Sequence, residues 1–260
     1  MDFFAELKAR NESLFWFGLI CLIASAVFIV LAKTSSVQVA GVNAWYKPLK
    51  FALSTAAFSW AMAWYIHYLP NYNPGLFNIR IIVLLSFEII YIAIQAGRGQ
   101  LSHFNLSTPV YSMLFSLMAI AATAVTVYAG YIGLLFFTKE VDLPAHYLWS
   151  IRAGIFIFVI FSLEGFVMGS RLSHTIGGAD GNHGIAFLGW SRKFGDPRIA
   201  HFIGMHALQV LPLLSWYLLR NTKATLIVAV IYLLLAAFTL VKALQGKPMF
   251  RAKKADTEQS

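Results

Sequence analysis

The sequence predicts an all-α integral membrane protein, a seven-transmembrane-helix bundle with a long Gly-rich loop between helices 5 and 6. Of its 260 residues, 59% are hydrophobic and 12% are charged, whereas a soluble domain carries roughly twice that charged fraction. The mean hydropathy is +0.69. The apolar residues occur in runs of about twenty, the length that crosses a bilayer as a helix.

The chain opens with a polar N-terminal segment, residues 1–13, of mixed charge. The first apolar run, 14–32, is longer than the core of a signal peptide and lacks a small-residue cleavage site. We therefore expect it to be a retained first helix. The single cysteine, Cys21, lies in this run, so no intrachain disulfide can form.

Six further apolar runs follow, and together with the first they predict one transmembrane domain over 14–244. They lie at 50–69, 79–97, 109–138, 144–170, 198–219 and 223–244. Thr108-Pro109 and Asp196-Pro197 each place a capping side chain before a proline, a pattern typical of helix starts. Pro212 could kink the sixth span, because proline leaves a helical carbonyl without its donor.

The positive charges indicate an orientation. With seven spans, more lysines and arginines fall on the side of the C-terminus, so we expect the N-terminus outside and the C-terminus in the cytoplasm, in a bacterial inner membrane. Residues 245–260 form a basic tail that we expect to be disordered and adjacent to the membrane. The net charge of +9 does not indicate nucleic-acid binding, because the chain has no basic helix and no RNA-binding motif.

Two segments share a pattern of polar residues. "SFEIIYIAIQAGRGQLSH" starts at Ser86 and "SLEGFVMGSRLSH" starts at Ser162. Each begins with Ser-x-Glu inside an apolar run and ends with an arginine and Leu-Ser-His beyond it. The pattern pairs Glu88, Arg98 and His103 with Glu164, Arg171 and His174. An ionisable residue inside a membrane indicates a functional site, so we expect both copies to serve one chamber near the cytoplasmic leaflet.

Histidines concentrate on the same side. Five of the seven lie at or just inside the predicted cytoplasmic surface: His103, His174, His183, His201 and His206. Imidazole and carboxylate ligands suit zinc or iron, which makes His103, His174, His206 and His183 the candidate metal ligands. His206 and Gln209 are three residues apart and share a helix face, and we assign His201 and Gln209 to cofactor binding. Each histidine taken alone is more often a hydrogen-bonded residue near a helix end than a ligand, and it is their concentration on one side that indicates a site.

The two membrane carboxylates and the two arginines are candidates for catalysis and for substrate binding. Glu88 and Glu164 are the candidate acid/base carboxylates, although each could instead be protonated within a helix interface. Arg98 and Arg171 could clamp the polar end of a ligand, because a guanidinium binds phosphate or carboxylate with two parallel hydrogen bonds. The Gly-rich loop after Arg171 is close to thirty residues long, and loops of that length are often lids.

Three functions fit these residues. The first is a metal-dependent membrane enzyme, an oxidoreductase or a hydrolase, that acts on a lipid, a quinone or another amphipathic substrate. The second is a haem b-binding electron-transfer protein with two histidine ligands. The third is a transporter or seven-helix sensor in which Glu88 and Glu164 relay ions or protons.

Overall fold

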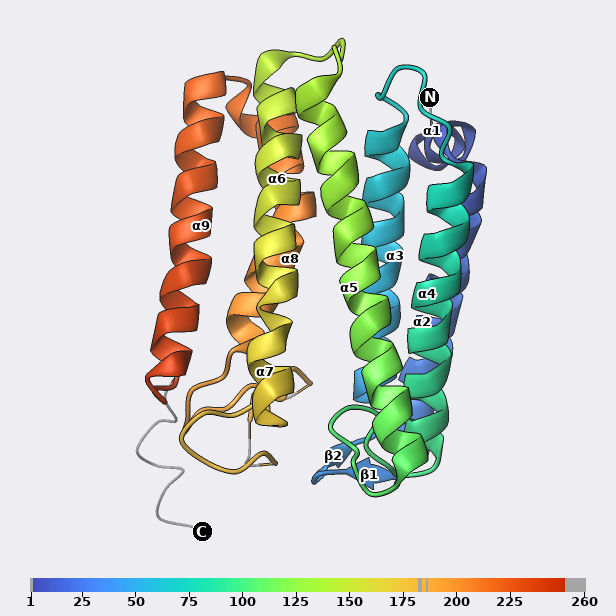
Figure 1. The fold of residues 1–260 in the computed structure, drawn as a ribbon, viewed down its shortest axis with the longest axis vertical. Coiled ribbons are helices and arrows are strands. Elements are labelled where there is room, and N and C mark those ends of the chain that lie inside the picture. Colours follow the sequence, from blue (N-terminus) through green and yellow to red (C-terminus); the bar gives the residue numbers. More distant parts are fainter. Residues whose placement is uncertain (1, 182–183, 186, 251–260) are drawn as a thin grey trace.

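The computed structural model describes residues 2–181, 184–185 and 187–250. The chain folds into a bundle of long helices that run along one axis (Figure 1). Within the described residues, six helices are long and apolar enough to cross a membrane, which indicates an integral membrane protein. They are α2 (Glu12–Thr34), α4 (Gly75–Gly97), α5 (Pro109–Thr138), α6 with α7 (Ala145–Leu163 and Gly165–Arg171), α8 with a π-helical turn (Arg198–Leu214 and Ser215–Leu219) and α9 (Thr222–Leu244).

The prediction of seven spans is therefore confirmed for six. The helix that corresponds to the expected span 50–69 is α3 (Tyr46–Ile66), which stands in the bundle beside α2. It is not one of the six apolar helices. The reason lies in its polar residues, since Lys47 and Lys50 occupy its first turns and Thr55 and Ser59 are buried within the bundle.

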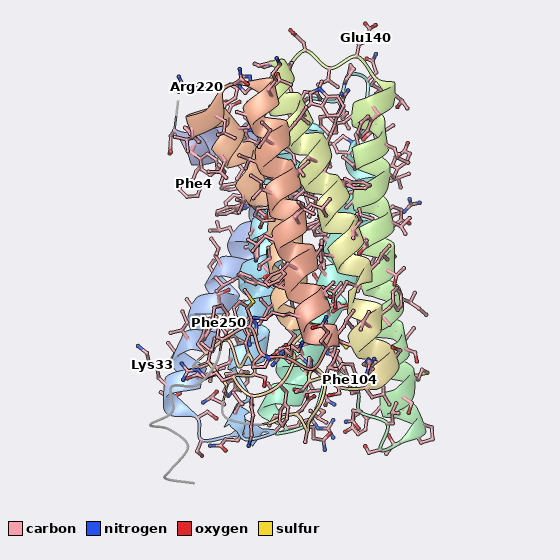
Figure 2. All side chains as sticks on the ribbon, turned by 90° about the vertical axis from the view of Figure 1, so that its left-hand side faces the viewer. Phe4, Lys33, Phe104, Glu140, Arg220 and Phe250 are labelled. Carbon is pink, nitrogen blue, oxygen red and sulfur yellow. The ribbon has the colours of Figure 1, made fainter. Side chains whose placement is uncertain are left out.

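The two ends of the bundle differ (Figure 1). One end carries the short helix α1 (Phe3–Arg10), and we call it the α1 end. The other, the loop end, carries the hairpin of β1 (Gln38–Val39) and β2 (Val42–Asn43) and the connections 98–108 and 172–197. Figure 2 shows Phe4, Glu140 and Arg220 at the α1 end and Lys33, Phe104 and Phe250 at the loop end.

The expected helix starts are present with one shift. Thr108 caps α5, because its Oγ1 accepts a hydrogen bond of 3.2 Å from the backbone N–H of Tyr111. The α8 helix begins at Arg198, one residue later than the proline pattern predicts. The carboxylate of Asp196 still accepts the first helical N–H, at 3.1 Å from the nitrogen of Arg198.

Helices α6 and α8 approach each other closely because glycines line their contact. A Cβ on Gly204 would lie 2.1 Å from the Cβ of Phe161, and a Cβ on Gly154 would lie 2.9 Å from the carbonyl oxygen of Ala207. Small residues at such positions let helix backbones come together in a membrane. This contact fixes the position of α8 relative to the end of α6, where Glu164 lies.

The outer surface of the bundle is apolar. Large aliphatic side chains are exposed along α2, α4, α5 and α9, including Ile20, Leu76, Leu134 and Leu234, each at least 60% exposed. Exposed apolar surface on this scale is unusual in a soluble monomer. A surface of this kind matches the expected contact with a lipid bilayer.

The expected tail begins at the loop end. Gly246 follows α9 with a φ of 72° and lies against Gly177 of the Gly-rich loop. The ring of Phe250 stacks on Trp190 with centroids 6.5 Å apart. The rest of the expected disordered tail, residues 251–260, lies outside the described residues.

Candidate functional site

The two Leu-Ser-His triplets meet at the loop end. His103 and His174 are close enough to interact electrostatically. Phe104 joins the two connections, because its ring lies 4.8 Å from that of His174 and 6.2 Å from that of His103. Phe104 has a φ of 61°, an unusual conformation for an aromatic residue. The predicted convergence of these two histidines is therefore present.

His103 is held by a lysine. The ammonium group of Lys47, on the first turn of α3, donates to Nδ1 of His103 at 3.0 Å, and the hydroxyl of Ser102 lies 3.3 Å from the same nitrogen. A ring nitrogen that accepts a hydrogen bond is unprotonated, so the neutral ring carries its proton on Nε2. Burial lowers the pKa of His103 well below its usual range, and the charges of Lys47 and His174 lower that pKa further.

His174 is held by a carboxylate. Its Nδ1 lies 3.2 Å from Oδ2 of Asp180, and its backbone N–H donates to the same oxygen at 2.9 Å. Ser173 donates to the other carboxylate oxygen at 3.0 Å. Asp180 therefore orients the ring with its Nδ1 protonated, which makes Nε2 the basic nitrogen of the ring.

The pKa values at this pair follow from its contacts. Burial lowers the pKa of His174, an effect larger than the opposing hydrogen bond to Asp180. Burial alone would raise the pKa of Asp180, but the hydrogen bonds from His174 bring that pKa below its usual range. At neutral pH the carboxylate is thus ionised and the imidazole is neutral.

Part of the Gly-rich loop lies between the starts of α3 and α8. Lys50 of α3 donates to the carbonyl oxygen of Leu188 at 3.0 Å, and Tyr46 contacts the ring of Phe187 edge-on with centroids 5.5 Å apart. On the other side, Arg198 of α8 donates to the carbonyl oxygen of Gly189 at 2.6 Å. We call residues 187–189 the loop clamp.

Glu88 lies deeper in the same region. It is nine residues before the end of α4, roughly 14 Å from that end at helical rise. Its side chain is buried and interacts electrostatically with Lys47. Its Oε1 has no hydrogen-bond partner among the described residues. Lys47 thus lies between a buried carboxylate and the imidazole of His103.

Glu164 belongs to a second group, formed by α6, α7 and α8. It interrupts the helix between α6 and α7, and its Oε2 lies 3.4 Å from Nδ1 of His201. His206, deeper in α8, is 3.3 Å from Oε1 of Gln209 through its Nδ1. The prediction that His206 and Gln209 share a helix face is confirmed.

The two arginines of the doubled pattern do not join the histidines. Arg98 and Arg171 are exposed, and within the described part of the chain neither guanidinium makes a hydrogen bond or an ion pair. Lys47, Lys50 and Arg198 are the cations at the site instead. The sequence signal for the two lysines is their place on the polar first turns of an otherwise apolar helix.

Of the four expected metal ligands, the described residues bring together His103 and His174. Within the part of the chain that the structure describes, no group of three or more His, Cys, Asp or Glu side chains could hold a metal ion, whereas a zinc site usually has at least three protein ligands. His183, the fourth expected ligand, lies outside the described residues.

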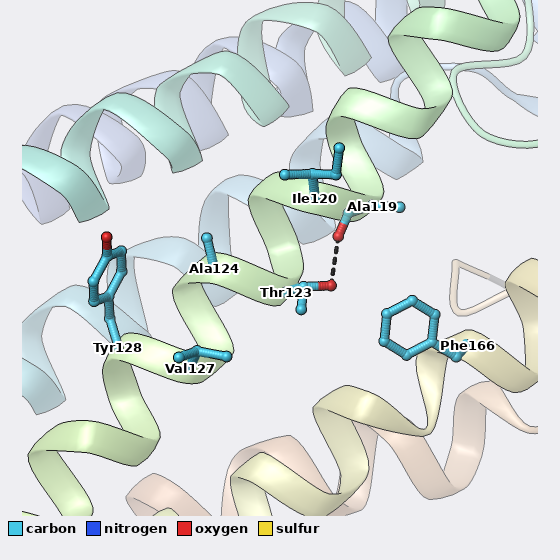
Figure 3. A pocket seen from close by; sticks show the side chains of 7 residues that line it. All are labelled: Ala119, Ile120, Thr123, Ala124, Val127, Tyr128 and Phe166. Carbon is cyan, nitrogen blue, oxygen red and sulfur yellow. Dashed lines mark hydrogen bonds between the residues drawn. The ribbon is translucent and has the colours of Figure 1, made fainter.

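An apolar groove lies on the flank of the bundle near this site. It has a volume of about 530 Å³ and lies between α5 and Phe166 of α7 (Figure 3). Its α5 wall consists of Ala119, Ile120, Thr123, Ala124, Val127 and Tyr128. Thr123 does not make the groove polar, because its hydroxyl donates to the carbonyl oxygen of Ala119 at 2.7 Å.

The groove begins next to the histidines along α5. Phe115 contacts the rings of His103 and Phe104, with centroids 6.3 and 5.5 Å apart. Ala119, the first groove residue, is one helical turn further along α5. The polar site and the apolar groove are therefore neighbours along one helix.

The fold and the site together define a helical membrane protein with a cluster of His, Lys and Asp side chains at one end of its bundle and an apolar groove beside that cluster. Comparison with protein-family models, with curated proteins and with solved structures gave no match.

Proposed function

We propose that this protein is a membrane-embedded enzyme that performs general acid–base chemistry on the polar end of an amphipathic substrate, a lipid or a quinone. The observation that carries this proposal is that two groups of opposite charge orient the two histidines: Lys47 contacts His103, and Asp180 contacts His174. The proposal covers His103, His174, Asp180, Lys47 and Glu88.

The two histidines have complementary roles. His174 is neutral at neutral pH and exposes Nε2 as a base, while Asp180 stabilises the imidazolium that forms when it accepts a proton. His103 carries its proton on Nε2 and can donate a hydrogen bond to an oxygen of the substrate. Lys47 stabilises negative charge that develops on that oxygen.

The groove along α5 supports an amphipathic substrate. Its lining from Ala119 to Tyr128 extends roughly 13 Å along the helix at 1.5 Å per residue. An apolar tail in this groove would lie parallel to the lipid chains, and the polar end would reach the histidines past Phe115. Apolar pockets with a few placed polar groups are the common form of small-molecule sites.

This proposal replaces the metal-dependent form of the enzyme. Among the described residues, the donors at the site are His103, His174 and Asp180; Nδ1 of His103 already faces Lys47, and Nδ1 of His174 already faces Asp180. Elemental analysis of the purified protein tests this choice directly. Zinc or iron at one ion per chain would restore the metal-dependent alternative.

We also propose that α3 crosses the membrane as the seventh span, which places the loop end at the cytoplasmic side of a bacterial inner membrane. The support is the antiparallel course of α3 within the bundle and the concentration of Lys and Arg at the loop end. Buried Thr55 and Ser59 face neighbouring helices rather than lipid, so they do not oppose this placement.

The test uses a membrane extract as the source of substrates. Purified protein in nanodiscs is incubated with bacterial lipid and quinone extract in deuterated water, and mass spectrometry follows product formation or deuterium incorporation. Wild type should convert one class of amphipathic molecule. Asp180→Asn should lower the rate by about 10²-fold or more, the typical contribution of a general base.

The matched control is Asp142→Asn, which changes an exposed aspartate in the connection before α6 and should leave the rate unchanged. Equal rates for wild type, Asp180→Asn and Asp142→Asn would refute the role of His174. The absence of any conversion by the wild type would refute the enzyme proposal as a whole.

A further inference from the structure

We infer that Glu164 and His201 form a proton-binding site inside the membrane, separate from the acid–base site of the proposed function. The proposal rests on the α6–α8 interface and not on the identity of any substrate. Three observations support the pair: the contact of His201 with a backbone carbonyl oxygen, the burial of Glu164, and the lack of hydrogen-bond partners for its carboxylate among the described residues.

The carboxylate is buried without hydrogen bonds. The side chain of Glu164 is 4% exposed, and within the described residues neither of its oxygens has a hydrogen-bond partner. An ionised carboxylate left in this state inside a membrane is strongly unfavourable. Glu164 is therefore stable only when a proton neutralises it directly or through a neighbouring cation.

His201 is that neighbour. Its Nδ1 lies 2.6 Å from the carbonyl oxygen of Phe161 and 3.4 Å from Oε2 of Glu164. The short contact to a carbonyl oxygen requires a proton on Nδ1, because the carbonyl can only accept. The second nitrogen, Nε2, is therefore the atom through which His201 gains or loses a further proton.

The two residues share one exchangeable proton. When it is present, the pair is either a neutral carboxylic acid beside a neutral imidazole or a carboxylate beside an imidazolium, and its net charge is zero. When the proton leaves, a carboxylate remains and the net charge is −1. Since the side chain of His201 is 29% exposed, the proton has a route in and out that Glu164 alone lacks.

Other charged and titratable groups near the pair are already engaged. His206 interacts electrostatically with His201 and contacts Gln209. Arg198, at the start of α8, is paired with Asp196. From α9, Tyr232 donates to the carbonyl oxygen of Ile203 at 2.6 Å. None of these contacts neutralises Glu164, so the shared proton does.

The pair lies at the junction of α6 and α7. The chain stays helical through Glu164, whose N–H bonds to the carbonyl oxygen of Ile160 at 3.1 Å, and the next turn is tighter, because the N–H of Val167 bonds to the carbonyl oxygen of Glu164 at 2.8 Å. The ring of His201 packs over Gly165, with its Cε1 3.5 Å from the place of a Cβ.

The test is infrared difference spectroscopy of the protein in nanodiscs without any substrate, titrated between about pH 5 and about pH 9, the range in which buried carboxylic acids ionise. We expect a protonated-carboxyl band that is lost in Glu164→Gln. His201→Gln should change the pH dependence of that band, because the imidazole that shares the proton is gone.

Two controls separate the sources of the signal. Glu88→Gln removes the buried carboxyl group of α4 and should leave the band that responds to His201→Gln. Glu140→Gln changes an exposed glutamate and should change nothing. An identical spectrum in Glu164→Gln, or a band whose midpoint follows sodium concentration rather than pH, would overturn the proposal. Because no substrate is present, these outcomes are independent of the proposed enzyme activity.

Discussion

The contact between Lys47 and His103, at the loop end, influences the protonation of both side chains. These residues are 56 positions apart in the chain and meet at 3.0 Å. The ammonium favours a neutral imidazole, since a second positive charge beside it would be repelled. The lysine therefore favours the ring form with the proton on Nε2, and its charge adds to the effect of burial, which is the larger cause of the lowered pKa of His103.

Replacing that lysine gives a prediction for a single residue. In Lys47→Met the pKa of His103 should rise, because the charge that lowers it is gone while the burial that also lowers it remains. The measurement is an NMR titration of ring-labelled histidine in detergent micelles or nanodiscs. Lys33→Met, which changes an exposed lysine at the end of α2, should leave His103 unchanged. An unchanged pKa of His103 in Lys47→Met would contradict the contact.

Residue chemistry could be predicted from sequence only in part. The Leu-Ser-His triplets and the two membrane carboxylates stood out because polar residues beside apolar runs are rare. The partners Lys47 and Asp180 did not, because their roles depend on contacts that the chain makes by folding. Arg98 and Arg171 carried the same sequence signal as the histidines, yet the helix ends turn them outward.

At the scale of elements, the contact of α6 with α8 depends on glycine. In Gly204→Ala the new methyl group would overlap Phe161, and the two helices would have to separate. We expect a loss of about 1–3 kcal/mol in stability, the usual cost of overpacking, measured by thermal or denaturant unfolding in detergent.

The matched control for that change is Gly169→Ala on α7, where a Cβ meets nothing within 4 Å. Alanine favours a helix over glycine by up to about 1 kcal/mol, so this variant should be as stable as wild type or slightly more. Equal stability of Gly204→Ala and Gly169→Ala would contradict the close packing of α6 on α8.

The connections at the loop end should respond to acid. His103 and His174 have pKa values lowered by burial, so the unfolded chain binds protons more readily than the folded chain, and stability falls as the pH drops below about 6.5. Asp180 has a lowered pKa too, and its contribution is lost further down, below about pH 4.

Hydrogen exchange measures this response. Between about pH 7 and about pH 5, with exchange rates corrected for the intrinsic effect of pH, protection should decrease in 98–108 and 172–181 and stay constant in α9. Replacing His103 by glutamine should reduce the change in the first connection. A uniform loss of protection along the chain would point to general destabilisation instead.

At the scale of the whole molecule, the proposal that α3 is a seventh membrane span has a direct test. α1 and the end of α9 lie at opposite ends of the bundle (Figure 1), as an odd number of crossings requires. In a Cys21→Ser background, a membrane-impermeant thiol reagent added to intact cells should label Asp2→Cys and not Lys247→Cys. Labelling of both variants, or of neither, would show an even number of crossings, and labelling of Lys247→Cys alone would reverse the orientation.

The architecture was the most predictable level. The apolar runs gave helix bounds within a few residues, and the expected run 109–138 coincides with α5, because length and hydrophobicity alone decide where a chain can cross a bilayer. The interruption at Glu164 and the π-helical turn after Pro212 were not foreseen in that form. Both depend on packing between helices, which no single apolar run encodes.

The loop clamp has a mechanical consequence. It connects α3 to α8 near their first turns, through Lys50 and Arg198. Tyr65 connects the same two helices further along the bundle, because its hydroxyl donates to the carbonyl oxygen of Leu208 at 2.7 Å. Two helices that are held together at two heights cannot rotate against each other about a single contact. We therefore expect α3 and α8 to keep their relative position while the protein functions. Motion at the site should be limited to rotation of side-chain rings and transfer of protons.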